Sequence, residues 1–168
     1  MTNTTDNLDE LFIVVDQDDH LLGYRTRYDC HHDRTLIHRV TNIAVFNSKG
    51  EVLLQKRSLT KDLYPGMYTL SASGHVARGE EYAQAAVRES EEEIGVKNLS
   101  LTLVAKKLVP AASETEMLAL FQATYDGPFH YNKDEVAGLE FMDRKRVNEV
   151  KLQLTPCAYA GLQILGWI

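Results

Sequence analysis

The chain has 168 residues, 44% of them hydrophobic and 25% charged, which is the composition of an ordinary globular protein. This length favours one domain over two, and a formal charge of −6 disfavours a nucleic-acid duplex as a partner, because duplex binding depends on clustered Lys and Arg. No apolar run approaches the roughly 20 residues that cross a bilayer, and the acidic N-terminus does not look like a secretory signal, so we expect a cytoplasmic protein without a membrane partner.

The beginning of the chain lacks hydrophobic periodicity, so we predict a disordered leader at residues 1–10 and a single domain over residues 11–168. In chain order, the β-rich segments that predict strands are residues 11–15, 21–27, 41–46, 51–57, 99–109, 116–125 and 137–143. Turn formers join the first two segments, and likewise the next two, into hairpins. Residues 28–34 predict a loop, and residues 59–80, which contain several Gly and Pro, predict loop and short strand.

Two segments predict helices. Residues 80–93 contain no Gly or Pro and are rich in Ala and Glu, and Gly95 follows as a stop signal. Residues 155–168 predict a C-terminal helix with Pro156 in its first turn. Strands and helices do not alternate strictly, so the expected fold is α+β, a mixed sheet covered by helices. Cys30 and Cys157 fit neither a disulfide framework nor a zinc spacing, so we expect both to stay reduced.

Three acids of the first predicted helix, Glu89, Glu92 and Glu93, are spaced three and four residues apart, so their side chains converge on one face. Three like charges repel unless a cation lies among them, and hard oxygen ligands suit Mg²⁺ or Mn²⁺. The alternative interpretation is a solvated acidic face.

The same helix carries a predicted core stripe at Ala83, Val87, Ser90 and Ile94. Ser90 is its polar member, and we expect its hydroxyl to donate a hydrogen bond to the carbonyl of Ala86. A helix anchored by such a stripe can hold its acidic face in place, which favours the metal site over the solvated face.

Residues 74–96 resemble the Nudix box: Gly, five residues, Glu, seven residues, Arg-Glu, an aliphatic, any residue, Glu-Glu, any residue, Gly and an aliphatic. The residues that match are Gly74, Glu80, Arg88, Glu89, Glu92, Glu93, Gly95 and Val96. Ser90 departs from the pattern, since the family has an aliphatic residue there. The resemblance implies a Nudix-type α/β/α sandwich with a mixed β-sheet.

The resemblance also implies a metal site and a reaction. Glu89, Glu92 and Glu93, with the carbonyl of Gly74, would bind Mg²⁺ or Mn²⁺. Such a site suits cleavage of a diphosphate linkage, because a metal neutralises phosphate oxygens and activates a water molecule.

Two further roles follow from the same resemblance. Glu80 and Arg88 would form a structural ion pair that orients the loop and the helix. The general base stays open among Glu92, Glu93 and Glu135, the last of which is an acid in a late loop.

Stretches outside the box resemble the branch of the superfamily that includes type I isopentenyl diphosphate isomerase. That resemblance implies a second metal site, formed by His31, His38, His75, Glu114 and Glu116. It also implies that Arg57 and Lys61 contact the diphosphate of a substrate.

The chain departs from the isomerase pattern at three positions. The catalytic cysteine of the isomerase aligns with Ser73, its active-site tryptophan aligns with Cys157, and isomerases carry a basic residue where this chain has Glu89. Serine is a poor substitute for a thiol as a proton donor to an alkene, so the pattern favours hydrolysis over isomerisation.

Three functional hypotheses remain. The first is divalent-metal-dependent hydrolysis of a nucleoside diphosphate derivative or a similar small pyrophosphate. The second is isomerisation of isopentenyl diphosphate, and the third is a non-catalytic nucleotide-binding module, which the complete set of box carboxylates disfavours. The sequence identifies no substrate and leaves the oligomeric state open, with a homodimer as one option.

Overall fold

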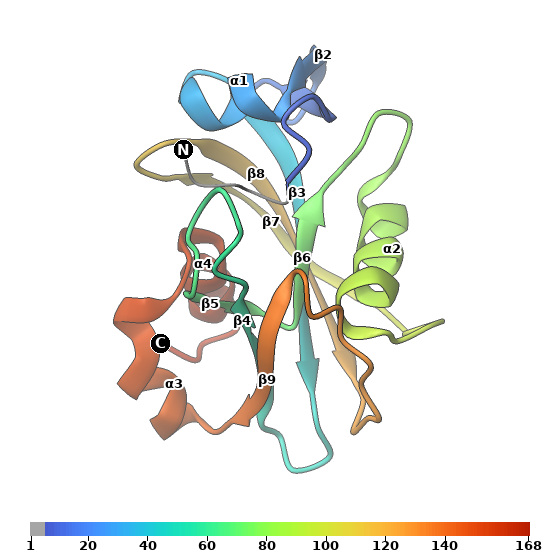
Figure 1. The fold of residues 1–168 in the computed structure, drawn as a ribbon, viewed down its shortest axis with the longest axis vertical. Coiled ribbons are helices and arrows are strands. Elements are labelled where there is room, and N and C mark those ends of the chain that lie inside the picture. The colour runs from blue at the N-terminus through green and yellow to red at the C-terminus, as the bar shows by residue number, and fades with distance from the viewer. Residues whose placement is uncertain (1–5) are drawn as a thin grey trace.

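The structure, a computed structural model, describes residues 6–168, and its strands join into one sheet (Figure 1). Within that range the strands are β1 (Leu11–Val15), β2 (Leu21–Thr26), β3 (Ile37–Phe46), β4 (Val52–Arg57), β5 (Tyr68–Leu70), β6 (Ala72–His75), β7 (Thr102–Pro110), β8 (Thr115–Thr124) and β9 (Val136–Met142). The helices are α1 (Arg27–His32), α2 (Tyr82–Ile94), α3 (Arg144–Val150) and α4 (Pro156–Ile164), with a 3₁₀ turn at Lys151–Gln153. None of the helices described is long and apolar enough to cross a membrane.

Strand β3 lies at the centre of the sheet. It pairs in parallel with β8 along its whole length and antiparallel with β1 and β6, so the predicted mixed sheet is confirmed. Strands β3 and β4 meet at the predicted hairpin turn through the Phe46–Val52 pair and then diverge, because β4 continues in register with β5 and β9 instead. The sheet therefore opens between β3 and β4.

Helices cover both faces of the sheet, which confirms the predicted α/β/α sandwich (Figure 1). Helix α2 packs on β3 and β6, where Ile43, Ala85 and Ile94 belong to one apolar core. Helix α4 packs on the other face, where Leu120 and Leu162 belong to a second core. Burying each such Leu or Ile contributes roughly 1.5–3 kcal/mol, so the two cores hold the sheet from both sides.

Helix α2 forms where the sequence predicts a helix, but it begins at Tyr82, two residues after the predicted start. Glu81 and Gln84 form a capping box, in which the side chain of each residue accepts a hydrogen bond from the backbone N–H of the other. The helix ends at Gly95, whose φ of 70° is the left-handed conformation that glycine adopts without strain.

The buried face of α2 differs from the predicted core stripe. Ser90 and Ile94 are fully buried, and the Ser90 hydroxyl donates to the Ala86 carbonyl at 2.8 Å, as predicted. Ala83 and Val87 are exposed, however, so the prediction is wrong for both. The apolar residues that replace them on the buried face are Tyr82, Ala85 and Ala86. The helix is rotated relative to the predicted orientation, because its buried face also includes Glu89 and Glu93.

Two short helices differ from the sequence predictions. Residues 28–34, predicted as a loop, contain most of α1, which begins where the Thr26 hydroxyl accepts a hydrogen bond from the Asp29 N–H. Helix α3 is not predicted at all, and Asp143 caps its start by accepting from the Arg146 N–H. Segments of six or seven residues are too short to show a helical period, so their caps were the only signal.

Residues 1–5 of the predicted disordered leader lie outside the described residues, but residues 6–10 differ from the prediction. The Asp6 carboxylate accepts from Lys61 Nζ at 2.9 Å and pairs with Arg27 at 3.1 Å. Glu10 pairs with the same guanidinium at 3.5 Å. The segment is held because it supplies acids to buried cations that are distant in sequence. Cys30 and Cys157 are both free, in agreement with the prediction that they are reduced.

Ile94 and Val87 allow a matched test of the corrected buried face. We expect Ile94→Ala to lower the free energy of unfolding by about 2–5 kcal/mol, because it leaves a cavity in a fully buried site. Val87→Ala, on the exposed face of the same helix, should change it by less than about 0.5 kcal/mol. Urea unfolding followed by circular dichroism measures both, and equal losses would contradict the observed rotation of the helix.

Candidate active site

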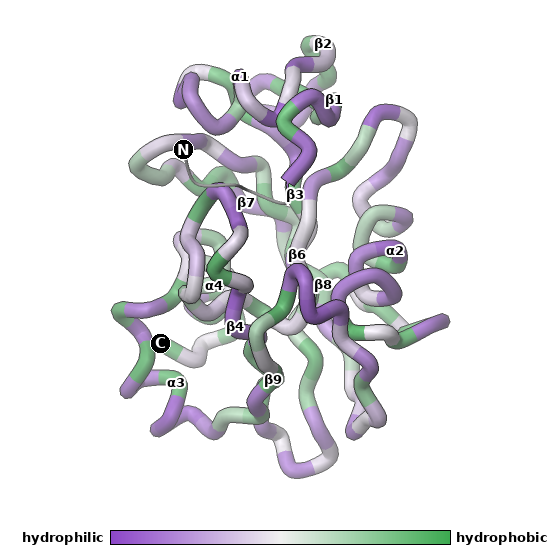
Figure 2. The backbone as a smooth tube through the Cα atoms, in the orientation of Figure 1, coloured by the Kyte–Doolittle hydropathy of each residue, from purple (hydrophilic) through white to green (hydrophobic). Residues whose placement is uncertain are grey.

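A cleft of about 440 Å³ opens beside helix α2, strand β6 and the segment that follows β4. Figure 2 shows hydrophilic residues along much of α2 and in the loop before β9, which flank this cleft. The predicted site residues that line it are Arg57, Lys61, Gly74, His31, His75, Arg88, Glu89, Glu92, Glu93, Glu114, Glu116 and Glu135. His38 and Glu80 are the predicted site residues that do not line the cleft.

Of the three acids of α2 that are predicted to bind metal, two are buried and one is exposed. Glu89 and Glu93 are buried, at 8% and 3% exposure, whereas Glu92 lies toward solvent. Glu93 accepts hydrogen bonds from the Gln55 amide at 2.6 Å and from the Ser73 N–H at 2.8 Å. A solvated acidic face is therefore excluded for Glu89 and Glu93.

Burial changes the acidity of both buried carboxyls. It raises the pKa of Glu93 to about 7, against the lowering effect of the Ser73 N–H. Burial and the charge of Glu93 also raise the pKa of Glu89 well above its ordinary value. Two adjacent buried carboxylates are costly unless cations neutralise them. Arg88 pairs with Glu89, whereas the donors to Glu93 are uncharged, so the pair is suited to bind a further cation.

Gly74 on β6 makes room for Glu89. A Cβ atom at this position would lie 2.0 Å from the Glu89 carboxyl group, far inside van der Waals contact. The glycine is thus required by the close approach of a carboxylate to the strand backbone rather than by an unusual dihedral angle. This approach also brings the backbone of residue 74 beside a predicted metal ligand.

Arg88 links α2 to the loop before it. Its guanidinium donates to both oxygens of Glu80, at 2.8 and 2.9 Å, and to the backbone carbonyl of His75 at 3.0 Å. The predicted Glu80–Arg88 ion pair is present in this bidentate form, which is the stronger geometry for such pairs. Arg88 also contacts Glu92 at 3.0 Å, so one cation orients both loop and helix.

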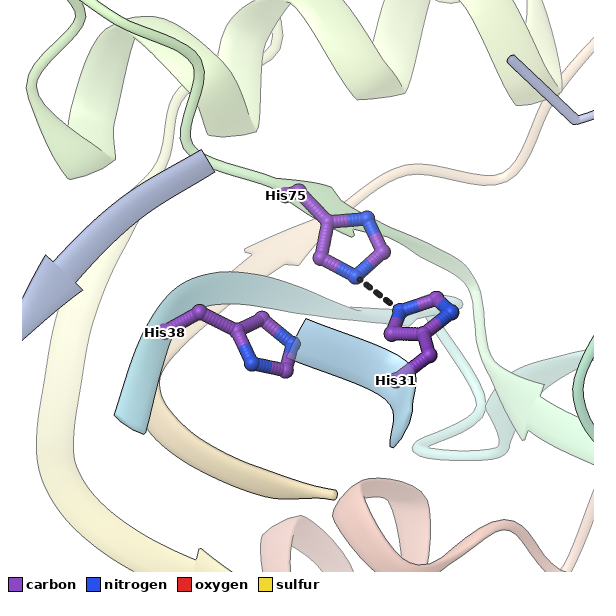
Figure 3. Close-up of side chains that lie close together, drawn as sticks. All are labelled: His31, His38 and His75. Atoms are coloured by element: carbon purple, nitrogen blue, oxygen red, sulfur yellow. Dashed lines mark hydrogen bonds between the residues drawn. The ribbon is translucent and has the colours of Figure 1, made fainter. Parts of the chain in front are cut away.

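Three histidines from separate elements converge at one side of the cleft (Figure 3). His31 lies in the last turn of α1, His38 lies on β3 and His75 ends β6. The Nε2 atoms of His31 and His75 face each other at 3.3 Å. Burial lowers the pKa of all three rings, for His38 to about 3, so they are neutral and able to act as ligands.

Two glutamates at the start of β8 complete this cluster: Glu114 immediately precedes the strand and Glu116 lies on it. The ligand atoms of His38, Glu114 and Glu116 all lie within 4.8 Å of one another. Glu114 Oε2 lies 3.4 Å from His31 Nε2 and 3.7 Å from His38 Nε2. Burial, reinforced by Glu116, raises the pKa of Glu114 to about 9. Neutral imidazoles and adjacent carboxyls form a donor set that fits a divalent metal ion.

The predicted phosphate contacts, Arg57 and Lys61, line the same cleft. Arg57 donates from Nε and Nη2 to the Leu63 carbonyl, at 3.2 and 3.0 Å. Lys61 Nζ contacts Glu135 at 3.0 Å as well as Asp6. Both cations therefore line the cleft together with Glu135, the acid in a late loop that is a candidate general base.

The sequence analysis missed residues that orient the predicted ones. Asp62 accepts from His31 Nδ1 at 2.9 Å and from Arg27 Nε at 3.0 Å, so it fixes the ring of His31. Gln55 similarly holds Glu93. An amide inside the apolar strand β4 was a usable signal for Gln55, whereas nothing local indicated Arg27 or Asp62.

Like Glu89, the other two positions that depart from the isomerase pattern line the cleft. Ser73 lies on β6 and binds Glu93 through its backbone N–H. Cys157, in the first turn of α4, has its Sγ 2.6 Å from Glu116 Oε2. A thiol is therefore present in the cleft, on a different element from the one the pattern predicts.

Comparison with known proteins gives three similarities. The family model for the NUDIX domain matches residues 36–160. An uncharacterized Nudix hydrolase of Pseudomonas aeruginosa is 35% identical over 148 residues, covering 88% of this chain and 87% of that protein. Isopentenyl-diphosphate Delta-isomerase 2 of Photorhabdus laumondii is also 35% identical, over 150 residues that cover 87% of this chain and 81% of that one.

A solved structure supports the same fold. The crystal structure of a Deinococcus radiodurans protein superposes with a TM-score of 0.77 at 22% identity, covering 94% of this chain and 98% of that chain. At this identity the similarity extends to the fold alone.

The burial of His38 makes its ring resistant to protonation. In metal-free protein we expect its ring resonances to stay unchanged down to about pH 5, since its pKa is about 3 when folded, against 6.5 as the ordinary value. Only the unfolded chain then gains this proton, so the ring's contribution to stability decreases as the pH falls through 6.5. Nuclear magnetic resonance of the histidine rings measures this, and a midpoint near 6.5 in folded protein would contradict the buried geometry.

Proposed function

The chain belongs to the Nudix family, and we propose on that premise that it hydrolyses the diphosphate linkage of a nucleoside diphosphate derivative or a similar small pyrophosphate, with a divalent metal ion. One observation carries this proposal: Glu89 and Glu93 are buried side by side against Gly74 in a cleft that also holds Arg57 and Lys61. This combination offers a cation site and anion-binding groups in one cavity.

The carboxylates of α2 would hold the metal. Glu89, Glu92 and Glu93, with the carbonyl of Gly74, are oxygen donors of the kind that Mg²⁺ or Mn²⁺ binds. When bound, such an ion neutralises phosphate oxygens and lowers the pKa of a water molecule. The proposed location is supported by the burial of two adjacent carboxylates that are only partly neutralised: Arg88 pairs with Glu89 but is shared with Glu80 and Glu92, and the donors to Glu93 are uncharged.

The remaining groups would bind the substrate and accept a proton. Arg57, at the end of β4, and Lys61, in the segment that follows, both line the cleft and supply positive charge for the phosphates. The proton of the attacking water goes to Glu92, Glu93 or Glu135. Glu93 is the most rigid of these acids, since Gln55 and Ser73 both donate to it.

Glu93→Gln tests the proposal, with Glu91→Gln as a matched control. Glu91 lies on the same helix but is exposed and paired with Lys97. We expect Glu93→Gln to lower kcat at least about 100-fold toward the best substrate from a panel of nucleotides, ADP-sugars and other pyrophosphates with Mg²⁺ or Mn²⁺. Glu91→Gln should keep the wild-type rate, and a chelator should abolish turnover.

Two outcomes would reject this proposal. The first is a wild-type rate in Glu93→Gln, which would exclude the α2 carboxylates from the mechanism. The second is tight nucleotide binding without turnover under any divalent ion, which would favour a non-catalytic binding module. Glu92→Gln and Glu135→Gln in the same assay separate the other candidate bases.

The histidine cluster favours a second candidate function, isomerisation of isopentenyl diphosphate. His31, His38 and His75 lie together with two glutamates, as the resemblance to the isomerase implies. Ser73 and Glu89 argue against isomerisation. Ser73 stands where the isomerase has its catalytic cysteine, and Glu89 stands where isomerases carry a basic residue. The Nudix hydrolase relative and the isomerase relative are both 35% identical to this chain, so sequence identity does not separate the two functions. The chemistry of the site has to separate them.

Solvent isotope exchange separates the two reactions. We expect no deuterium from heavy water to enter isopentenyl diphosphate over hours at high enzyme concentration, because Ser73 is a poor acid. Proton magnetic resonance of the substrate measures this. Incorporation of deuterium together with appearance of the allylic isomer would instead establish isomerisation.

A further inference from the structure

Cys157 contacts the histidine–glutamate cluster from outside. Its Sγ lies 2.6 Å from Glu116 Oε2, so the thiol donates a hydrogen bond to that carboxylate. The two residues come from different elements, α4 and β8, and Cys157 is only 7% exposed. The contact therefore ties the first turn of α4 to one of the two acids of the cluster.

The cluster itself has buried polar atoms without partners. Both ring nitrogens of His38 and the Oε2 atom of Glu114 form no hydrogen bond, although His38 is wholly buried. His31 and His75 direct their Nε2 atoms at each other across 3.3 Å (Figure 3). Buried polar atoms are costly unless paired, so their convergence points to a bound cation.

The geometry places the thiol next to the ion site rather than in it. In this cluster the ligand atoms that gather within 4.8 Å of one another are those of His31, His38 and His75, and those of His38, Glu114 and Glu116. Cys157 belongs to neither group. Its thiol donates to Glu116 Oε2, so this hydrogen bond leaves the other oxygen of Glu116 available to an ion.

We propose that Cys157 is a positioning residue for a divalent-ion site formed by the three histidines and the two glutamates. Its thiol fixes the rotation of the Glu116 carboxylate, as outer donors commonly do for metal ligands. The mixed imidazole and carboxylate set fits ions of intermediate softness such as Zn²⁺ or Co²⁺. This inference rests on the cluster as a metal site, which is separate from the carboxylates of α2 in the proposed hydrolysis.

Cys157 also packs in an apolar cluster with Val40, Val109, Leu118 and Ala160. A thiol that only fills this space would affect stability and leave ion binding unchanged. Replacing it by a residue of similar size that still donates a hydrogen bond separates the two roles. Serine keeps the donor, and alanine removes it.

The test is a titration of metal-free full-length protein with Co²⁺ alone, followed by visible absorption. Broadening of the His38 ring resonances by the paramagnetic ion assigns the signal to the cluster. We expect Cys157→Ala to weaken Co²⁺ binding about 10- to 100-fold and to alter the cobalt spectrum. Cys157→Ser should restore affinity to within a few fold of wild type.

Several outcomes would overturn the inference. Wild-type affinity in Cys157→Ala would show that the thiol only fills space, and a loss that serine does not restore would exclude its role as a donor. A sulfur-to-cobalt charge-transfer band in wild type would make Cys157 a direct ligand. Absence of Co²⁺ at the cluster would remove the site itself, while hydrolysis by the α2 carboxylates would still be decided by Glu93→Gln.

Discussion

The burial of Glu89 and Glu93 is the constraint on which much of the structure depends. Two carboxylates inside a protein require donors and space, and neighbouring elements supply both: Gln55 on β4, the N–H of Ser73, and the missing side chain at Gly74. The same requirement explains the rotation of α2, since a helix that buries two acids cannot also bury Ala83 and Val87. Core packing and site geometry are thus set by one face of one helix.

Strand β6 joins the two candidate ion sites. Gly74 faces the carboxylates of α2, and the next residue, His75, belongs to the histidine cluster. Arg88 reinforces this link because it binds the His75 carbonyl while pairing with Glu80. A shift of β6 would therefore disturb both sites together. Phe12, stacked on the His75 ring with centroids 3.8 Å apart, limits such a shift from the other side.

Long, regular elements were predictable from sequence. Short elements, and segments held by residues distant in sequence, were not. Strand β8 and helix α2 lie within two residues of their predicted bounds, whereas β3 begins at Ile37, four residues before the predicted strand. Helices α1 and α3 are too short to show a period. The leader prediction failed over residues 6–10 because Asp6 is bound by Arg27 and Lys61, and no local pattern indicates partners so distant in sequence.

By itself the sequence determined the family and predicted the helix and the residue types of both candidate sites, since these are encoded by fixed spacing within short segments. Tertiary structure alone decided how those residues are placed. It buried Glu89 and Glu93 but left Glu92 exposed, brought histidines from α1, β3 and β6 within reach of one ion, and placed the Cys157 thiol on Glu116. Burial and contacts between distant segments arise only when the sheet and its helices pack, so no local pattern contains them.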